Sequence, residues 1–271
     1  MRASNSDSHG DRMPRRARKP RGSYHHGELR TALLAEAAAV VESEGITALS
    51  LRDLARRLGV SHAAPAHHFA DRAALVVELA RDGFERFAAA LETAGAQGRD
   101  PLDRLRRIGE AYVRFAIEHP GRFRVMFGPE LSDDGPMPAP LAEASERSYQ
   151  VVVAALETVL ARWPAGRRPS TDAVAFTCWT IGHGAATLWL DGPIRRKAPP
   201  SEARALFELR YAATLDLLVG ALAPPGARGT PAQRTRPSRT RDVDRKPPRD
   251  GARRRQHSGP PRGARRVRVG R

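Results

Sequence analysis

Residues 46–75, ITALSLRDLARRLGVSHAAPAHHFADRAAL, hold two short helical patterns joined by a tight turn, and this feature constrains the fold most. In residues 51–58, leucine and alanine recur at helical spacing on one face, and arginines occupy the other. Ser50 and Asp53 match a capping box, so we expect them to satisfy free backbone amides at the start of this helix. Gly59 suits a turn that needs a positive φ angle. The pattern predicts a helix, a turn and a second helix.

The second pattern, residues 61–68, has an unusual composition for a helix in a protein core. It contains three histidines, three alanines and a proline, and no large apolar side chain. We expect Ser61 to cap this helix and Pro65 to fall in its first turn, where proline is tolerated. Phe69 then returns to the core, and Asp71 can cap a third helix. A short helix that protrudes in this way fits the major groove of duplex DNA, and the alternative is an ordinary helical hairpin within a core.

The flanking segments extend this unit on both sides. An apolar stripe predicts a helix over residues 28–44, which Gly45 would end. Another helix is expected over residues 72–93. The preceding arm, residues 21–27, is basic, polar and aromatic, so it could reach a phosphate or the minor groove. Two adjacent histidines in this arm lack a third partner, so we predict no metal site.

These segments carry a family resemblance. The pieces YHHGELRTALLAEAAAVVESEGITALSLRDLARRLGVS and HHFADRAAL resemble the N-terminal DNA-binding domain of the TetR family of transcriptional regulators. The resemblance implies a three-helix head in which residues 51–58 form the scaffold helix and residues 61–68 the recognition helix. Family members usually carry an aromatic residue, which commonly touches the DNA backbone, where this chain has Ala66. His67 is the nearest polar replacement.

The DNA-contacting candidates lie in the arm, at the start of the scaffold helix, in the recognition helix and just after it. A solvated face is the alternative interpretation for the histidines of the recognition helix. The candidates are Tyr24, His25, His26, Ser50, Arg52, Ser61, His62, Ala63, Ala64, Ala66, His67, His68 and Arg72.

The net charge of +16 is concentrated at the two ends of the chain. Residues 1–22 hold seven basic and two acidic residues, and residues 223–271 hold sixteen and three, whereas residues 23–222 are close to neutral. Both ends are rich in Arg, Pro, Gly and Ser, so we expect disordered tails. A basic tail attracts phosphate without sequence preference, although arginine-rich composition also follows from a GC-rich genome.

The remaining sequence predicts further helices and no strands. Alternating runs of β-branched and aromatic residues are missing, and a loop with four prolines is expected over residues 128–140. We therefore predict an all-α fold, with a helix–turn–helix DNA-binding domain over residues 23–93 and a second helical domain over residues 94–222. Helical spacing predicts its helices over residues 101–119, 142–163, 173–190 and 202–222.

One of these helices, residues 173–190, carries no formal charge over 18 residues. Its length approaches that of a membrane span. However, it contains threonines, glycines and a histidine, and it lacks an aromatic belt. A helix that is apolar all round must be buried, and Gly182, Gly184 and Ala185 would permit close helix contact. We therefore predict a homodimer interface and no membrane insertion.

Two segments of the second domain extend the resemblance. HPGRFRVMFGPEL (residues 119–131) and WTIGHGAATLWLDG (residues 179–192) resemble the WHG-type C-terminal domain of one branch of the TetR family. The resemblance implies a helical domain that dimerises and encloses a pocket for a small-molecule effector. Packing within the core is the alternative for each pocket candidate. The candidates are Phe115, Phe123, Met126, Phe127, Tyr149, Trp179 and His183.

The predicted function is a ligand-responsive transcriptional regulator, a repressor that binds a palindromic operator as a dimer and that an effector releases. The sequence has no nucleophile elbow, HExxH motif, phosphate-binding glycine loop or metal-spaced Cys/His cluster, so we expect no enzymatic activity and no cofactor. A single cysteine, Cys178, excludes an internal disulfide. The N-terminus lacks the apolar core of a signal peptide, so we expect a cytoplasmic, nucleoid-associated protein. The alternative is an arginine-rich architectural protein that coats DNA.

Overall fold

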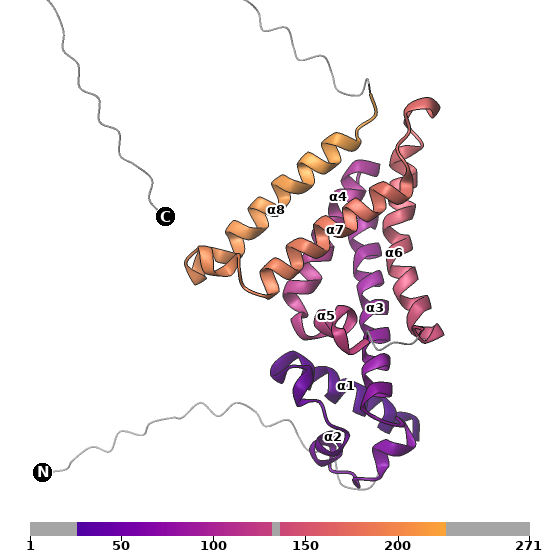
Figure 1. Ribbon diagram of the computed structural model, residues 1–271, viewed down its shortest axis with the longest axis vertical. Coiled ribbons are helices and arrows are strands. Elements are labelled where there is room, and N and C mark those ends of the chain that lie inside the picture. Colours follow the sequence, from indigo (N-terminus) through magenta and orange to yellow (C-terminus); the bar gives the residue numbers. More distant parts are fainter. Residues whose placement is uncertain (1–25, 132–135, 226–271) are drawn as a thin grey trace, which may run out of the picture. The chain divides into compact units, whose positions relative to one another are not determined.

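The computed structural model describes residues 26–131 and 136–225, and within these ranges it contains helices and no strands (Figure 1). The predicted all-α fold is confirmed. Tyr24, His25 and the predicted tail over residues 1–22 lie outside the described residues, as does nearly all of residues 223–271. The α-helices are α1 His26–Glu44, α2 Leu51–Leu58, α3 Arg72–Ala96, α4 Pro101–Glu118, α5 Pro120–Phe127, α6 Ala139–Leu160, α7 Thr171–Leu190 and α8 Pro200–Leu222.

Helices α1 and α2 and the first turns of α3 form the head. The predicted stripe of α1 is buried, as are the anchors Phe69 and Leu75. Arg30 of α1 places its guanidinium 5.4 Å from the centre of the Phe69 ring and donates a hydrogen bond to Glu78 of α3 at 2.6 Å. Asp71 caps α3 as predicted, because its side chain accepts a hydrogen bond from the amide of Ala74 at 2.8 Å.

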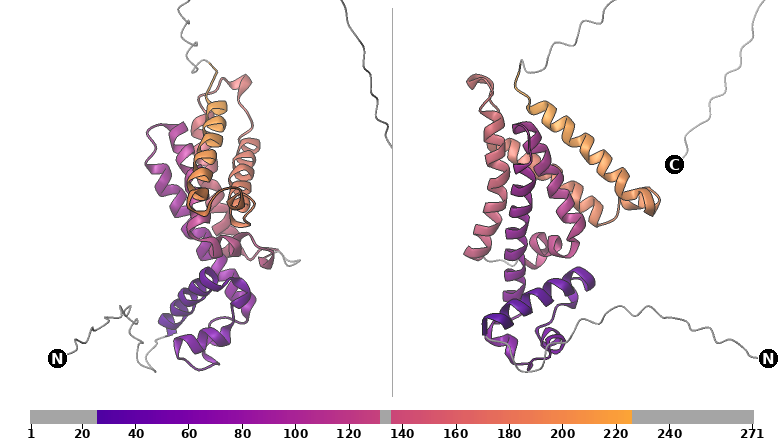
Figure 2. Two further views of the ribbon diagram at one scale, coloured as in Figure 1. Left: turned by 90° about the vertical axis from the view of Figure 1, so that its left-hand side faces the viewer. Right: turned by 180° about the vertical axis from the view of Figure 1, so that it is seen from behind.

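Helix α3 begins in the head and ends in the second helical domain, which also contains α4 to α8 (Figure 2). Its second half buries Phe84, Phe87 and Leu91, and the helix packs on α4 and α6. The boundary predicted between residues 93 and 94 therefore falls inside one continuous helix. Helices α7 and α8 both pack on α4.

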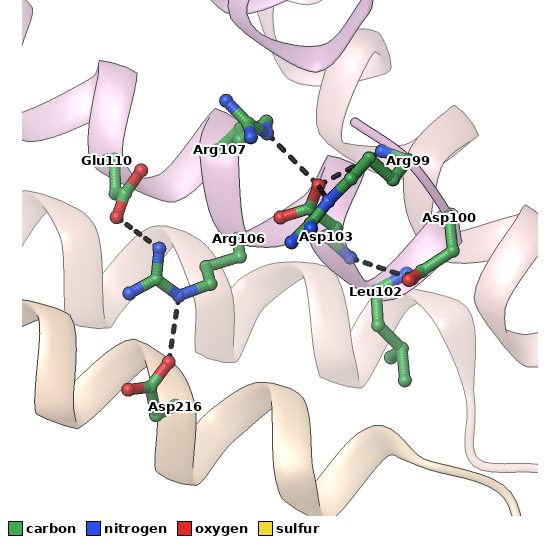
Figure 3. A network of polar contacts seen from close by, with 8 residues as sticks. All are labelled: Arg99, Asp100, Leu102, Asp103, Arg106, Arg107, Glu110 and Asp216. Atoms are coloured by element: carbon green, nitrogen blue, oxygen red, sulfur yellow. Dashed lines mark hydrogen bonds and ion pairs between the residues drawn. The ribbon is translucent and has the colours of Figure 1, made fainter. Parts of the chain in front are cut away.

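The start of α4 is fixed by carboxylates. Asp100 accepts hydrogen bonds from the amides of Leu102 and Asp103, at 2.9 and 3.0 Å (Figure 3). Arg106 then bridges α4 and α8, because its guanidinium bonds Asp216 at 2.8 Å and Glu110 at 2.5 Å. These pairs are solvated, so they orient the helices more than they stabilise them.

The predicted capping box is wrong. Ser50 stands at the N-cap of α2 in an extended conformation, but its side chain makes no capping hydrogen bond. Asp53 is held instead by Arg56 at 2.5 Å and by Arg57, both on its own helix. Two charged donors one turn away compete better for this carboxylate than a neutral backbone amide does. Gly59 adopts the predicted positive φ, 72°, and ends α2.

The predicted recognition helix, residues 61–68, is also wrong in its detail. The chain forms only a short 3₁₀ segment over Ala64–His67, its N-cap is Ala63, and no side chain, that of Ser61 included, caps it. Pro65 has no amide hydrogen, so the bond that would carry an α-helix through this turn cannot form. The amides of Ala64 and Ala66 instead bond carbonyls three residues back, at 3.0 and 3.2 Å.

Among the described residues, no helix has the length and apolar character that crossing a membrane requires. Helix α7 is not buried all round, since Phe176 and Leu188 are 59% and 48% exposed. Leu209 and Leu217 of α8 are 68% and 78% exposed. An apolar surface therefore remains open on both helices in the single chain.

Candidate DNA-binding surface and ligand cavity

The segment after α2 presents small and polar side chains to solvent. Ser61, His62, Ala63, Ala66 and His67 are exposed, whereas Pro65 is buried and faces the core. His68 and Ala64 are half-buried. A recognition segment of alanines and short polar residues leaves its backbone accessible to a close partner. The predicted side chains thus lie at the surface, on a 3₁₀ turn in place of an α-helix.

The arginines of α2 differ in their availability. Hydrogen bonds from Arg57 and Arg56 hold the pKa of Asp53 below its ordinary value, and Arg57 also bonds Glu44 at 2.9 Å. These two arginines are therefore largely neutralised by acids of the head. Arg52 is exposed, and no ion pair involves it within residues 26–131 and 136–225.

Arg72 lies at the start of α3, and its side chain also binds within the head. Its guanidinium donates to the carbonyls of Leu49 at 3.2 Å and Ile46 at 2.8 Å, which lie in the turn before α2. These bonds hold the start of α3 against that turn and occupy two of the donors of Arg72. Arg72 therefore stabilises the packing of the head, although the residue is exposed to solvent.

A cavity of about 300 Å³ lies among five helices of the second helical domain. Its wall is built mainly from aromatic and aliphatic side chains. Helices α3, α4, α6, α7 and α8 contribute Phe84, Phe87, Leu91, Leu105, Ile108, Gly109, Tyr112, Ser145, Glu146, Ser148, Tyr149, Val152, Phe176, Cys178, Trp179, Gly182, Tyr211, Leu215, Leu218 and Val219, and Phe127 of α5 completes the lining.

Two tyrosines supply hydroxyls at the α4 side of the cavity. The hydroxyl of Tyr112 lies 3.1 Å from Nδ1 of His183, and that of Tyr211 donates to the carbonyl of Gly109 at 3.1 Å. Burial raises the pKa of both phenols, so both stay protonated at neutral pH. Burial lowers the pKa of His183, which favours the neutral imidazole.

The chain is similar to known families of proteins over both of its domains. One family model, described as bacterial regulatory proteins of the tetR family, matches residues 33–79. A second, described as the tetracyclin repressor-like C-terminal domain, matches residues 105–215. The chain belongs to the TetR family. The second match contains both segments on which the C-terminal resemblance rests.

Solved structures agree with this assignment. A protein of unknown function from Rhodococcus sp. RHA1 is 35% identical, with a TM-score of 0.62, over 74% of this chain and 98% of that one. The TetR family transcriptional regulator PfmR from Thermus thermophilus is 25% identical, with a TM-score of 0.52, over 69% and 97%. A search of curated protein sequences gave no match. The chain is a DNA-binding transcriptional regulator of the TetR family.

The predicted ligand residues of this regulator divide into two groups. Phe127, Tyr149 and Trp179 line the cavity. His183 does not line it, but its ring lies 4.8 Å from that of Phe127 and it supports the hydroxyl of Tyr112. Phe115, Phe123 and Met126 do not line the cavity and are buried in the surrounding core.

Sequence reasoning missed the tyrosines and the α3 side chains of the cavity. Tyr112, Tyr211, Phe84 and Phe87 sit on amphipathic helices, where an aromatic residue at helical spacing is typical of core packing. Only the long-range packing of α3, α4 and α8 shows that these four face a void. Within the described residues, no cluster of three or more His, Cys, Asp or Glu side chains could hold a metal ion.

In this TetR-family chain, hydrogen bonds between α1 and α5 join the head to the second helical domain. Glu42 of α1 accepts hydrogen bonds from the amides of Gly121 at 2.8 Å and Arg122 at 3.1 Å. These are free amides of the first turn of α5, so Glu42 acts as an external cap of that helix. Arg122 also forms an ion pair with Asp82 of α3. Helix α5 thus contacts the head at one end and lines the cavity, through Phe127, at the other.

Proposed function

We propose that this TetR-family regulator is a ligand-responsive repressor. A homodimer binds a palindromic operator through two recognition turns, and a small molecule in the cavity releases it. The observation that supports this most directly is that two helices, α3 and α5, each contact the head and also line the cavity. Cytoplasmic location and the lack of catalytic activity are part of the same proposal.

The coupling between the two sites runs through short, stiff connections. Helix α5 has only eight residues, so a shift of Phe127 at the cavity wall displaces the first turn that Glu42 caps. Helix α3 carries Phe84 and Phe87 of the wall on the same rod that begins in the head. A ligand that moves either wall changes the angle of the head. A coupling energy of about 1–3 kcal/mol would change operator affinity about 5- to 150-fold.

The open surface of α7 and α8 supports dimerisation with a second copy. Helix α8 exposes a stripe at intervals of three to four residues, namely Ala205, Leu209, Ala213, Leu217 and Gly220. Helix α7 exposes or half-exposes Ala173, Thr177, Thr180, Gly184 and Leu188 at the same spacing. The hydroxyls of the two threonines donate to carbonyls of α7 itself, which leaves their methyl groups outward. Stripes of small and apolar residues suit the close, self-complementary packing of a two-fold dimer.

The dimer sets the spacing of the DNA contacts. Two recognition turns would enter major grooves about 34 Å apart, one turn of the duplex. We assign base contacts to Ser61, His62, Ala63, Ala66 and His67, which are exposed together. Ser50, Arg52, Ala64, His68 and Arg72 lie beside them and would contact the backbone or support the turn. The arm residues Tyr24, His25 and His26 complete the proposed surface.

Selection of bound sites from random DNA, followed by footprinting with the full chain, tests the regulatory function. A short palindromic footprint supports it. A uniform footprint that lengthens with protein concentration would support the architectural alternative, which the basic ends of the sequence favour. The selected operator then serves in a screen for molecules that lower the affinity. Deleting residues 224–271 and measuring the salt dependence of binding shows whether the C-terminal segment adds phosphate contacts.

A further inference from the structure

The lining of the cavity is almost free of charge. Among the described residues that line it, Glu146 is the one acidic side chain, and none is a lysine, arginine or histidine. The deeper wall consists of rings and aliphatic chains such as Phe84, Phe87, Leu91 and Ile108. An anionic group taken into this wall would lose its hydration without gaining a cation. Such a transfer is strongly unfavourable, so the lining selects against carboxylates and phosphates.

The one acid is at the edge of the cavity. Glu146 is exposed and accepts a hydrogen bond from Gln150 at 2.5 Å. Burial raises the pKa of the neighbouring phenol of Tyr149, and the negative charges of Asp172 and Glu146 add to the increase. The carboxyl group of Glu146 disfavours an anion at this edge, and it is too solvated to hold a cation firmly.

The polar groups that face a ligand are neutral. The hydroxyl of Tyr112 can accept or donate one more hydrogen bond beside its contact with His183, and that of Tyr211 can accept one. Gly182 lies between them, since a Cβ atom there would be 3.4 Å from the Tyr112 ring and 3.5 Å from the Tyr211 hydroxyl. The absent side chain leaves these phenols open to the cavity. Because Tyr211 can only accept, these two phenols suit a ligand hydroxyl, which can donate to Tyr211, and not a carbonyl.

We propose that the cavity takes an uncharged, ring-containing small molecule with one hydroxyl group, which Tyr112 and Tyr211 recognise. This proposal rests on the proposed ligand-responsive function, because it names the chemical class of that effector. The volume of about 300 Å³ is at the lower end of ligand pockets and suits a molecule of a few rings. The aromatic side chains of Trp179, Phe176 and Phe127 in the lining favour a ligand with flat rings.

A matched set of probes tests the class by calorimetry with the full chain. The four probes share one ring system: 2-naphthol, naphthalene, 2-naphthoate and 2-naphthylmethylammonium. We expect 2-naphthol to bind most tightly, naphthalene about tenfold more weakly, and 2-naphthoate at least a hundredfold more weakly. Equal or tighter binding of the anion or the cation overturns the proposal. So does a failure of all four to bind folded protein.

Variants separate recognition from structure. Tyr112→Phe should lower the affinity for 2-naphthol about tenfold and leave that for naphthalene unchanged, whereas a purely structural role would lower both equally. Gly182→Leu should abolish binding of both, and Gly166→Ala, at an exposed position between α6 and α7 with open space around it, should change neither. Operator release is measured separately. Binding of 2-naphthol without release would contradict the repressor mechanism and leave the ligand class intact.

Discussion

The contact between Glu42 and the first turn of α5 gives the sharpest prediction. A Cβ atom at Gly121 would lie 2.4 Å from the carbonyl oxygen of Val41 and 2.8 Å from the Cα atom of Glu42. Both neighbours are backbone atoms of α1, so neither can rotate away. Gly121→Ala must therefore push α5 away from the head and lengthen the two hydrogen bonds that Glu42 accepts.

The size of the effect follows from these contacts. Overpacking against a rigid neighbour costs about 1–3 kcal/mol. Weakening two hydrogen bonds to a carboxylate adds about 1–2 kcal/mol, since each contributes about 1.5–3 kcal/mol when intact. Alanine has a higher helix propensity than glycine, and this difference offsets less than about 1 kcal/mol of the lost stability. We expect a net loss of about 3 kcal/mol, which lowers Tm by about 6–12 °C in a domain of this size.

Differential scanning calorimetry of wild type, Gly121→Ala and Gly166→Ala measures this loss. Gly166 has open space around its Cβ direction and lies outside the proposed dimer surface, so the same substitution there should leave Tm unchanged. In the operator assay, Gly121→Ala should still bind DNA when folded but respond less to ligand. A Tm within about 1 °C of wild type, together with an undiminished ligand response, would refute the role of this contact.

Three further predictions concern the DNA surface, the dimer and pH. His67→Ala should weaken operator binding by about 1–3 kcal/mol in gel-shift titrations, and Arg147→Ala, exposed on α6, should have no effect; equal affinities for wild type and H67A would mean that the recognition turn is misassigned. Leu217→Glu should convert a dimer to a monomer in light scattering, whereas Ser201→Glu at the start of α8 should not, and a monomeric wild type would rule out the proposed interface. Burial lowers the pKa of His183 below 6.5, so its neutral form stabilises the fold fully above that pH, and this contribution is lost as the pH falls through the folded-state pKa. His183→Asn should therefore flatten the decline of Tm between about pH 7 and pH 5, and an unchanged slope would show that the imidazole does not titrate in the fold.

The features that local sequence determines were predicted well. Leu51–Leu58 is found with the predicted bounds, and Gly59 has the positive φ expected of its turn. Both follow from helical spacing and from the backbone freedom of glycine, which depend on few neighbours. The buried anchors Phe69 and Leu75 follow from the same pattern.

The failures come from competition between local partners and from distant packing. Asp53 could bond backbone amides or arginines, and only the positions of Arg56 and Arg57 decide the outcome. Pro65 is compatible with the first turn of an α-helix, but its missing amide and its burial favour a 3₁₀ turn. No helix was predicted over residues 120–127, because Pro and Gly usually end a helix, yet Pro120 occupies the first turn of α5, where proline is tolerated.

The cavity shows why candidates drawn from one segment mislead. Phe123, Met126 and Phe127 share the short helix α5, yet only Phe127 faces the void. Met126 instead fills the space beside Gly83, where a Cβ atom would lie 2.7 Å from its Cγ. The same packing fixes α5 to α3, so its two ends cannot move independently. A ligand that displaces Phe127 would therefore move the whole of α5. That motion would reach the head through the hydrogen bond that Glu42 of α1 accepts from the first turn of α5.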